Sequence, residues 1–260
     1  MKQVLLTFDI EEFDSLFDFD YPSEEEDIFK ISKNGLDKIA KLLEKNEIKA
    51  TFFTTAKFAK KYPKLIREIS KKHEIACHGY SHSDNYKKDI SKIDLAKKEI
   101  EKIIKKNING FRAPRFEIKD ISSLSDIGFS YDSSIHPTFI PGRYMHLFKK
   151  RKVHKIGEII EIPLSVFPLV RLPIFWLAFK NLPLLYSKLF AKINFLSSDY
   201  LMLIFHSWEF DNLSKIKIPK YMKKKSGDEF LKMLEEYIIY LKSIGCTFST
   251  ISGYLQKSLR

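Results

Sequence analysis

Apolar stretches of strand length alternate with amphipathic stretches of helix length along nearly the whole chain. The strand-like stretches are rich in β-branched and aromatic residues. They cover residues 3–9, 50–55, 74–78, 110–114, 129–134, 158–164, 200–206 and 246–252. Because parallel strands need long crossover connections, this alternation favours a parallel sheet with helices packed outside it. We therefore predict an α/β fold in which the sheet closes into a (β/α) barrel.

The helical stretches carry apolar residues at helical spacing, as in residues 36–43, and the last clear helix is predicted over 228–243. No internal repeat, low-complexity segment or linker separates these elements. One domain is therefore predicted over residues 1–260. The acidic and aromatic stretch 14–27 departs from the pattern and is predicted to form a loop over the mouth of the barrel.

Polar residues interrupt or follow four of the strands near their carboxyl ends. They are Asp9 and Glu11 on the first strand, His78 on the third, Arg112 on the fourth and His206 on the seventh. Taken singly, each has an ordinary explanation, such as a turn cap, a surface ion pair or a satisfied core histidine. In a βα barrel, however, the carboxyl ends of the strands share one rim, where active sites lie. Since clusters of titratable groups mark functional sites, we predict an active site at this rim.

The stretch CHGYSH, residues 77–82, places His78 and His82 four positions apart. A loop or helical turn can bring such positions to one face, so both imidazoles could bind one metal ion. The spacing alone does not distinguish this site from a surface or hydrogen-bonded histidine pair. Cys77 could be a soft ligand, although free cysteine is more typically a small buried residue. Cys246 is the only other cysteine, so no disulfide framework is expected.

Five motifs together resemble those of the polysaccharide deacetylase family, also described as the NodB-homology or carbohydrate esterase family 4 fold. They are LTFDIEEF, HEIACHGYSH, FRAPRF, IGFSYDSSIHP and LIFHSWEFD, and they follow the family order from residue 6 to residue 211. The FDxE form of the first motif, with HxWEFD near the end, resembles a subgroup associated with exopolysaccharide synthesis. The resemblance implies a distorted (β/α) barrel of seven or eight mostly parallel strands.

The resemblance also implies a divalent metal ion, usually Zn²⁺, held by an acid and two histidines. By position, His78 and His82 are the imidazole ligands. Ile10 stands where many family members carry an aspartate ligand, so Glu11 is the expected acidic ligand and Glu12 is the alternative. Alternate residues of a strand point to opposite faces, which places residue 11 on the side of residue 9 and favours Glu11.

The other predicted site residues take their roles from the family pattern. Asp9 matches the catalytic base, Arg112 matches the arginine that orients this base, and His206 matches the histidine of the last motif, which would protonate the leaving amine. Trp208 and Glu209 follow His206 and are predicted to contact the substrate. Trp208 could instead only pack, and Glu209 could instead orient His206 or pair with a lysine.

These residues predict a metal-dependent hydrolase that removes N-acetyl groups from an N-acetylated sugar and releases acetate. The expected substrate is a polysaccharide or a lipid- or nucleotide-linked glycan precursor. Two alternatives remain open. One is a hydrolase of another non-peptide C–N bond, such as that of a cyclic imide or ureide. The other is a catalytically inactive, carbohydrate-binding relative.

The net charge of +12 favours anionic partners. Lysines are spread along helices such as 87–106 as a solvated face, and the sequence contains no recognisable nucleic-acid module, so nucleic acid is not an expected partner. Residues 168–195 combine aromatic residues with Arg and Lys, and could lie on a membrane surface or pack against the barrel. The N-terminus lacks a signal-peptide pattern and no uncharged apolar run reaches transmembrane length, so a cytoplasmic location is expected.

Overall fold

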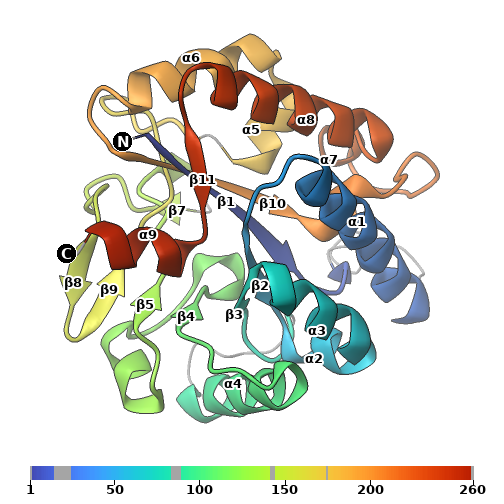
Figure 1. Ribbon diagram of the computed structural model, residues 1–260, viewed down its shortest axis with the longest axis vertical. Coiled ribbons are helices and arrows are strands. Elements are labelled where there is room, and N and C mark those ends of the chain that lie inside the picture. Colours follow the sequence, from blue (N-terminus) through green and yellow to red (C-terminus); the bar gives the residue numbers. More distant parts are fainter. Residues whose placement is uncertain (1, 15–24, 83–88, 141–143, 174, 259–260) are drawn as a thin grey trace.

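The computed structural model describes residues 2–14, 25–82, 89–140, 144–173 and 175–258. One mostly parallel sheet runs through its centre (Figure 1). Its strands are β1 (Gln3–Ile10), β2 (Thr51–Thr54), β3 (Glu74–Cys77), β4 (Gly110–Phe111), β5 (Tyr131–Asp132), β8 (His154–Ile156), β9 (Ile159–Glu161), β10 (Tyr200–His206) and β11 (Thr247–Ser249). The order across the sheet is β10-β1-β2-β3-β4-β5-β9-β8, and β11 pairs with β1. Two short strands, β6 (Phe139–Ile140) and β7 (Tyr144–Met145), form a separate antiparallel pair.

All eight predicted strands are present, and the sheet curls into the expected distorted barrel. Hydrogen-bonded ladders do not close it within the described residues, because the antiparallel strand β8 ends one edge and β10 ends the other. The chain that follows β9 bridges this gap. The hydroxyl of Ser165 accepts a hydrogen bond from the backbone N of Met202 (2.9 Å), and the hydroxyl of Tyr200 donates to the carbonyl oxygen of Pro163 (2.9 Å). The predicted closure is therefore achieved by side chains rather than by a ladder.

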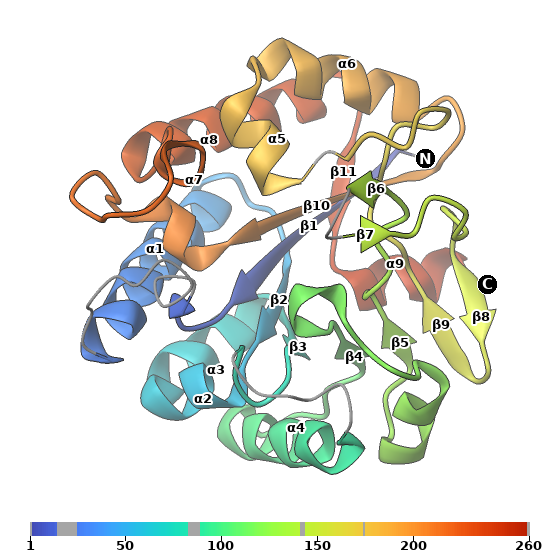
Figure 2. The same ribbon diagram turned by 180° about the vertical axis from the view of Figure 1, so that it is seen from behind.

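Helices surround the sheet. They are α1 (Glu25–Lys45), α2 (Ala56–Lys61), α3 (Pro63–Lys72), α4 (Ile90–Ile104), α5 (Trp176–Asn181), α6 (Leu184–Asn194), α7 (Lys220–Lys223), α8 (Asp228–Ser243) and α9 (Ile251–Ser258). In both views α5, α6 and α8 form one group at the top, and α2, α3 and α4 form another at the bottom (Figures 1 and 2). The helix predicted over 228–243 coincides with α8.

Strand β1 is central, and all eight of its residues are buried between β10 on one edge and β2 and β11 on the other. Apolar side chains such as Phe8 therefore belong to the core. Two of its buried polar residues, Thr7 and Asp9, lie near the candidate site and need partners, because an unpaired buried polar group costs about 1–3 kcal/mol. Thr7 donates to the carbonyl oxygen of Leu203 (2.8 Å). Asp9 pairs with Arg112.

Helix α1 packs closely against η5, a 3₁₀ turn over Ser207–Phe210. A Cβ atom added to Gly35 would lie 1.8 Å from the carbonyl oxygen of Ser207, so only glycine permits this approach. The contact positions the turn that carries Trp208 and Glu209.

The two stretches that departed from the sequence pattern have different outcomes. Residues 15–24 of the predicted mouth loop lie outside the described residues, and α1 begins at Glu25. The 168–195 segment forms a turn followed by α5 and α6. It buries Phe179 and Phe190 in the core, yet Leu185 is 73% exposed. The segment therefore has both a packed side and an apolar outer side.

Candidate active site

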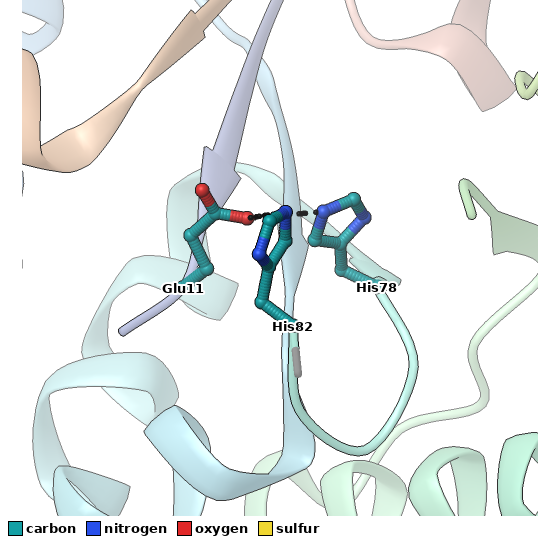
Figure 3. Close-up of side chains that lie close together, drawn as sticks. All are labelled: Glu11, His78 and His82. Atoms are coloured by element: carbon teal, nitrogen blue, oxygen red, sulfur yellow. Dashed lines mark ion pairs between the residues drawn. The ribbon is translucent and has the colours of Figure 1, made fainter. Parts of the chain in front are cut away.

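Three predicted ligands converge at the carboxyl ends of β1 and β3 (Figure 3). Glu11 follows β1, while His78 and His82 lie in the loop that follows β3. Oε2 of Glu11 is 3.3 Å from Nε2 of His78 and 3.5 Å from Nε2 of His82. One ligand atom from each of the three residues lies within 4.8 Å of the others. The loop thus brings both imidazoles to the same carboxylate oxygen.

This donor set fits a divalent metal ion. Two atoms bound tetrahedrally at about 2.0–2.1 Å lie about 3.4 Å apart, close to both measured separations. Oε2 of Glu11 is buried and has no hydrogen-bond partner within the described part of the chain. Such an oxygen is costly to bury unless something compensates it. A cation between the carboxylate and the two imidazoles would provide that compensation.

Each histidine is oriented by a bond to its other ring nitrogen. Nδ1 of His78 donates to the carbonyl oxygen of Arg112 (2.8 Å), and Nδ1 of His82 lies 2.8 Å from Oδ1 of Asp14. These bonds leave Nε2 of both rings directed toward Glu11. Metal-bound histidines in proteins have this arrangement, in which the outer partner sets the tautomer and the ring direction.

Electrostatics at this cluster favour a positive charge between the ligands. Burial alone would raise the pKa of Glu11, but attraction to His82, His78 and His206 outweighs it and holds that pKa well below its usual value. Burial alone would lower the pKa of His82, but the charge of Glu11 and the bond to Asp14 raise it to about 9. Negative charge on Glu11 and positive charge beside it therefore stabilise each other.

Glu12, the alternative acidic ligand, faces away from the histidine ring nitrogens. Its Oε2 accepts a hydrogen bond from the hydroxyl of Thr55 (3.0 Å), and its Oε1 accepts one from the backbone N of His82 (3.1 Å). Burial raises the pKa of Glu12. The structure thus places Glu11 among the ligand atoms and Glu12 under the loop that carries His82.

Asp9 lies beside the cluster and is held by Arg112. Oδ1 of Asp9 accepts a hydrogen bond from Nη1 of Arg112 (2.8 Å), and Oδ2 is 3.7 Å from Nε2 of His78. Arg112 is fully buried, donates also to Thr7 and Ser133, and lies over the ring of Phe53 at 4.0 Å. A guanidinium held in this way fixes the position of the carboxylate that it binds. One oxygen of Asp9 is therefore anchored while the other faces the cluster.

His206 ends β10, directly opposite Asp9 in the parallel ladder. Oε1 of Glu209 accepts hydrogen bonds from the backbone N (2.8 Å) and from Nδ1 (2.9 Å) of His206. Burial opposes charge on His206, but the bond to Glu209 and the negative charges of Glu11, Glu209 and Asp9 raise its pKa above the usual value. The ring is therefore suited to hold and donate a proton.

Trp208 and Glu209 are 2% and 0% exposed and lie behind His206. The indole of Trp208 stacks on Phe13 and on His206, and its Nε1 donates to Oε1 of Glu11 (3.3 Å). Oε2 of Glu209 is 3.5 Å from Nζ of the buried Lys180. Substrate contact by these two residues stays a prediction. Packing by Trp208 and orientation of His206 by Glu209 are the contacts the structure contains.

Sequence reasoning did not identify three contributors. Asp14 orients His82, Lys180 reaches Glu209, and Trp176 meets His206 edge to face, with ring centroids 5.3 Å apart. The acidic run after β1 was a usable signal for Asp14. A single lysine inside the apolar stretch 175–180 was a usable signal for Lys180, but nothing in the sequence connected it with Glu209.

The chain resembles known proteins in its sequence and in its fold. The family model described as polysaccharide deacetylase matches residues 1–131. No curated protein matches the chain. The fold is similar to that of a Mycobacterium smegmatis protein provisionally described as a polysaccharide deacetylase, with 17% identity, a TM-score of 0.68 and coverage of 98% of this chain and 89% of that chain.

Two other solved structures share the fold. One is a peptidoglycan N-acetylglucosamine deacetylase, with 19% identity, a TM-score of 0.54 and coverage of 96% of this chain and 86% of that chain. The other is a Bacillus anthracis protein described as a CE4 family pseudoenzyme, with 14% identity, a TM-score of 0.55 and coverage of 96% and 64%. The match to the family model extends over half of the sequence, so the chain belongs to the polysaccharide deacetylase family.

Proposed function

We propose that the protein is a metal-dependent hydrolase that removes N-acetyl groups from an N-acetylated sugar and releases acetate. Glu11, His78 and His82 would hold the ion, for which Zn²⁺ is the expected identity. When bound, such an ion supplies a Lewis acid that lowers the pKa of water and stabilises negative charge on a carbonyl oxygen. The observation that carries the proposal is the unpartnered oxygen of Glu11, which faces two imidazole nitrogens beside the Asp9–Arg112 pair.

Asp9 serves as the general base and accepts a proton from the attacking water. Its free oxygen is 3.7 Å from Nε2 of His78, so it borders the space where the reacting groups would meet. Arg112 binds the other oxygen and fixes the orientation of the carboxylate. Asp9 is therefore placed to act on water beside the ion rather than as a ligand.

His206 serves as the general acid and donates a proton to the departing sugar amine. Its pKa is raised above the usual value, and Glu209 fixes the direction of the ring through Nδ1. The other ring nitrogen is then the proton donor. Base and acid come from neighbouring strands, because Asp9 and His206 are paired in the ladder between β1 and β10.

The inactive, carbohydrate-binding alternative has a precedent among the structural neighbours, one of which is described as a pseudoenzyme. What supports catalysis in this chain is that base, base-orienting arginine, acid and three ligand groups are all present and in contact. No specific feature favours a cyclic imide or ureide over an acetylated sugar. Both alternatives are therefore treated as outcomes of the experiment.

The experiment combines metal analysis with acetate release. Protein stripped with a chelator and reloaded with Zn²⁺ is incubated with N-acetylglucosamine oligosaccharides, and released acetate is measured. His78→Ala should lose the metal. Asp9→Asn should keep the metal and lose about 10²–10⁴-fold in turnover, the usual contribution of a general base. His154→Ala is the matched control, because that histidine lies on β8, away from the cluster.

Three results would contradict the proposal. Full activity of Asp9→Asn would remove Asp9 from its role. Glycan binding without acetate release by the metal-loaded protein would identify an inactive relative. Hydrolysis of hydantoin, a cyclic ureide, in the absence of any acetate release would identify a different C–N hydrolase.

A further inference from the structure

The positive charge of the chain is concentrated in one quarter of it. Residues 133–198 contain ten Lys and Arg residues but only two acidic residues, Glu158 and Glu161, so they carry +8 of the net +12. Glu161 and Lys180 are both fully buried, so neither adds charge to the surface. The surface formed by this quarter is therefore strongly basic.

The same quarter exposes large apolar side chains in two turns that touch each other. In the turn 167–172, Leu169 is 93% exposed and Val170 is 64% exposed. In the turn 147–150, Phe148 is 95% exposed and is followed by two exposed lysines. Nη1 of Arg171 donates to the carbonyl oxygen of Lys149 (2.9 Å), which holds the two turns together.

Helix α6 extends this surface. Leu185 and Leu189 are 73% and 51% exposed, and the exposed Lys192 continues the same helical stripe. The ring of Phe167, at the base of the turn 167–172, contacts Phe190 of α6 with ring centroids 4.7 Å apart. We call the turns 147–150 and 167–172, together with the outer side of α6, the basic apolar face.

We propose that the basic apolar face docks on the surface of a lipid bilayer that contains anionic phospholipids. Exposed leucines and phenylalanines gain free energy by entering the boundary between headgroups and acyl chains, and lysines beside them pair with headgroup phosphates. No helix within the described ranges is long and apolar enough to cross a membrane, so this contact is peripheral. A bilayer satisfies both the apolar and the charged components of the face.

A second copy of the chain and a nucleic acid are both less complementary to this face than a bilayer. Two copies of the chain that met through it would bring two positively charged surfaces together. Nucleic acid would neutralise the lysines but would leave the leucines in water. An anionic bilayer combines negative headgroups with an apolar interior, which is the chemistry complementary to this face.

Docking would also orient the candidate active site. The chain continues from the turn 167–172 into α5, whose Trp176 contacts His206 edge to face. Only a few residues of the chain therefore separate the basic apolar face from Trp176, which contacts His206 of the candidate active site. This arrangement would hold the site near the bilayer, although membrane binding itself does not depend on the proposed deacetylase activity.

The test is co-sedimentation of the full chain with vesicles of phosphatidylcholine alone and of phosphatidylcholine mixed with phosphatidylglycerol. The protein should bind only the mixed vesicles and should be released by high salt. Lys149→Glu/Lys150→Glu should weaken binding by at least about 20-fold, since each lysine near an anionic surface contributes about fivefold. Leu185→Ser should weaken binding by about tenfold, the usual effect of one buried leucine.

Matched controls use exposed residues far from the face. Lys41→Glu/Lys102→Glu changes two exposed lysines on α1 and α4, and Leu95→Ser changes a leucine of α4 that is 48% exposed. Both should bind vesicles nearly as well as the wild type. Acetate release from a soluble oligosaccharide should be unchanged in every variant, which separates this test from that of the proposed function.

The proposal is overturned if the wild type binds neither vesicle type, or if the face variants and the control variants lose binding equally. It is also overturned if the wild type forms a dimer that Leu185→Ser dissociates, because the face would then bind a second copy. Far-ultraviolet circular dichroism establishes that each variant is folded. The two lysines are exposed, so their replacement leaves the core intact.

Discussion

The bond between Glu209 and His206 offers a sharp test of the proposed acid. Oε1 of Glu209 accepts from both the backbone N and Nδ1 of His206, and Oε2 lies 3.5 Å from Nζ of Lys180. Glu209→Gln keeps the size of the side chain and the accepting oxygen. It removes the negative charge and replaces Oε2, the oxygen that faces Lys180, by an amide NH2 group.

The expected direction follows from that charge. A negative charge at hydrogen-bond distance favours the imidazolium, so its removal should lower the pKa of His206. In the wild type the pKa of His206 is raised, so the proton-donating form is present below that pKa and is lost as pH rises through it. The alkaline limb of kcat should therefore move to lower pH by the same amount.

Glu209 also pairs with Lys180, so Glu209→Gln should lower stability as well as affect His206. A second variant separates these two effects. Lys180 is fully buried, so loss of its carboxylate partner leaves an uncompensated charge, which typically costs about 3–5 kcal/mol of stability. The double variant Lys180→Met/Glu209→Gln removes both charges and should regain much of that stability. It should not restore the alkaline limb, because the charge beside His206 is still missing.

The assays are the pH dependence of acetate release, denaturant unfolding, and NMR titration of the histidine resonances. If Glu209 acts through His206, the alkaline limb of kcat and the NMR titration of His206 should both move to lower pH in both variants. A wild-type alkaline limb in Glu209→Gln, accompanied by lower stability, would refute the reasoning and leave Glu209 with a purely structural role.

Three further predictions concern the rest of the fold. Gly35→Ala should lower stability and activity together, because the added Cβ would collide with the carbonyl of Ser207. This effect should outweigh the gain of about 1 kcal/mol in helix propensity. Denaturant unfolding and acetate release are the measurements. Arg112→Met should cost about 3–5 kcal/mol of unfolding free energy, because Asp9 would be buried without a partner, and Arg112→Met/Asp9→Asn should recover part of it. Burial lowers the pKa of His73 to about 4, so the folded protein favours the neutral ring. The free energy of unfolding should therefore decrease by about 1–2 kcal/mol as pH falls from about 6.5 toward 4. The decline should be smaller in His73→Gln when unfolding is measured across that pH range.

Strand β1 illustrates how much the sequence could predict. Its eight residues are mostly apolar, so a buried strand could be predicted from composition, and the polar residues at its end stood out. The period of two along a strand favoured Glu11 over Glu12, and the structure places Glu11 with the histidine nitrogens. The strands β6, β7 and β8 have two or three residues each, which is too short to show a period, and they were not predicted.

The sequence by itself determined the local elements and the chemical types available at the strand ends. Those properties depend on neighbours a few positions away, as does the spacing of His78 and His82. Only the tertiary structure decided which side chains meet. Lys180 reaches Glu209 and Asp9 reaches Arg112 across 29 and 103 positions of the chain, because the curled sheet and the packing of α5 against β10 bring them together. Contacts of that kind depend on the packing of the whole core, and no local pattern specifies them.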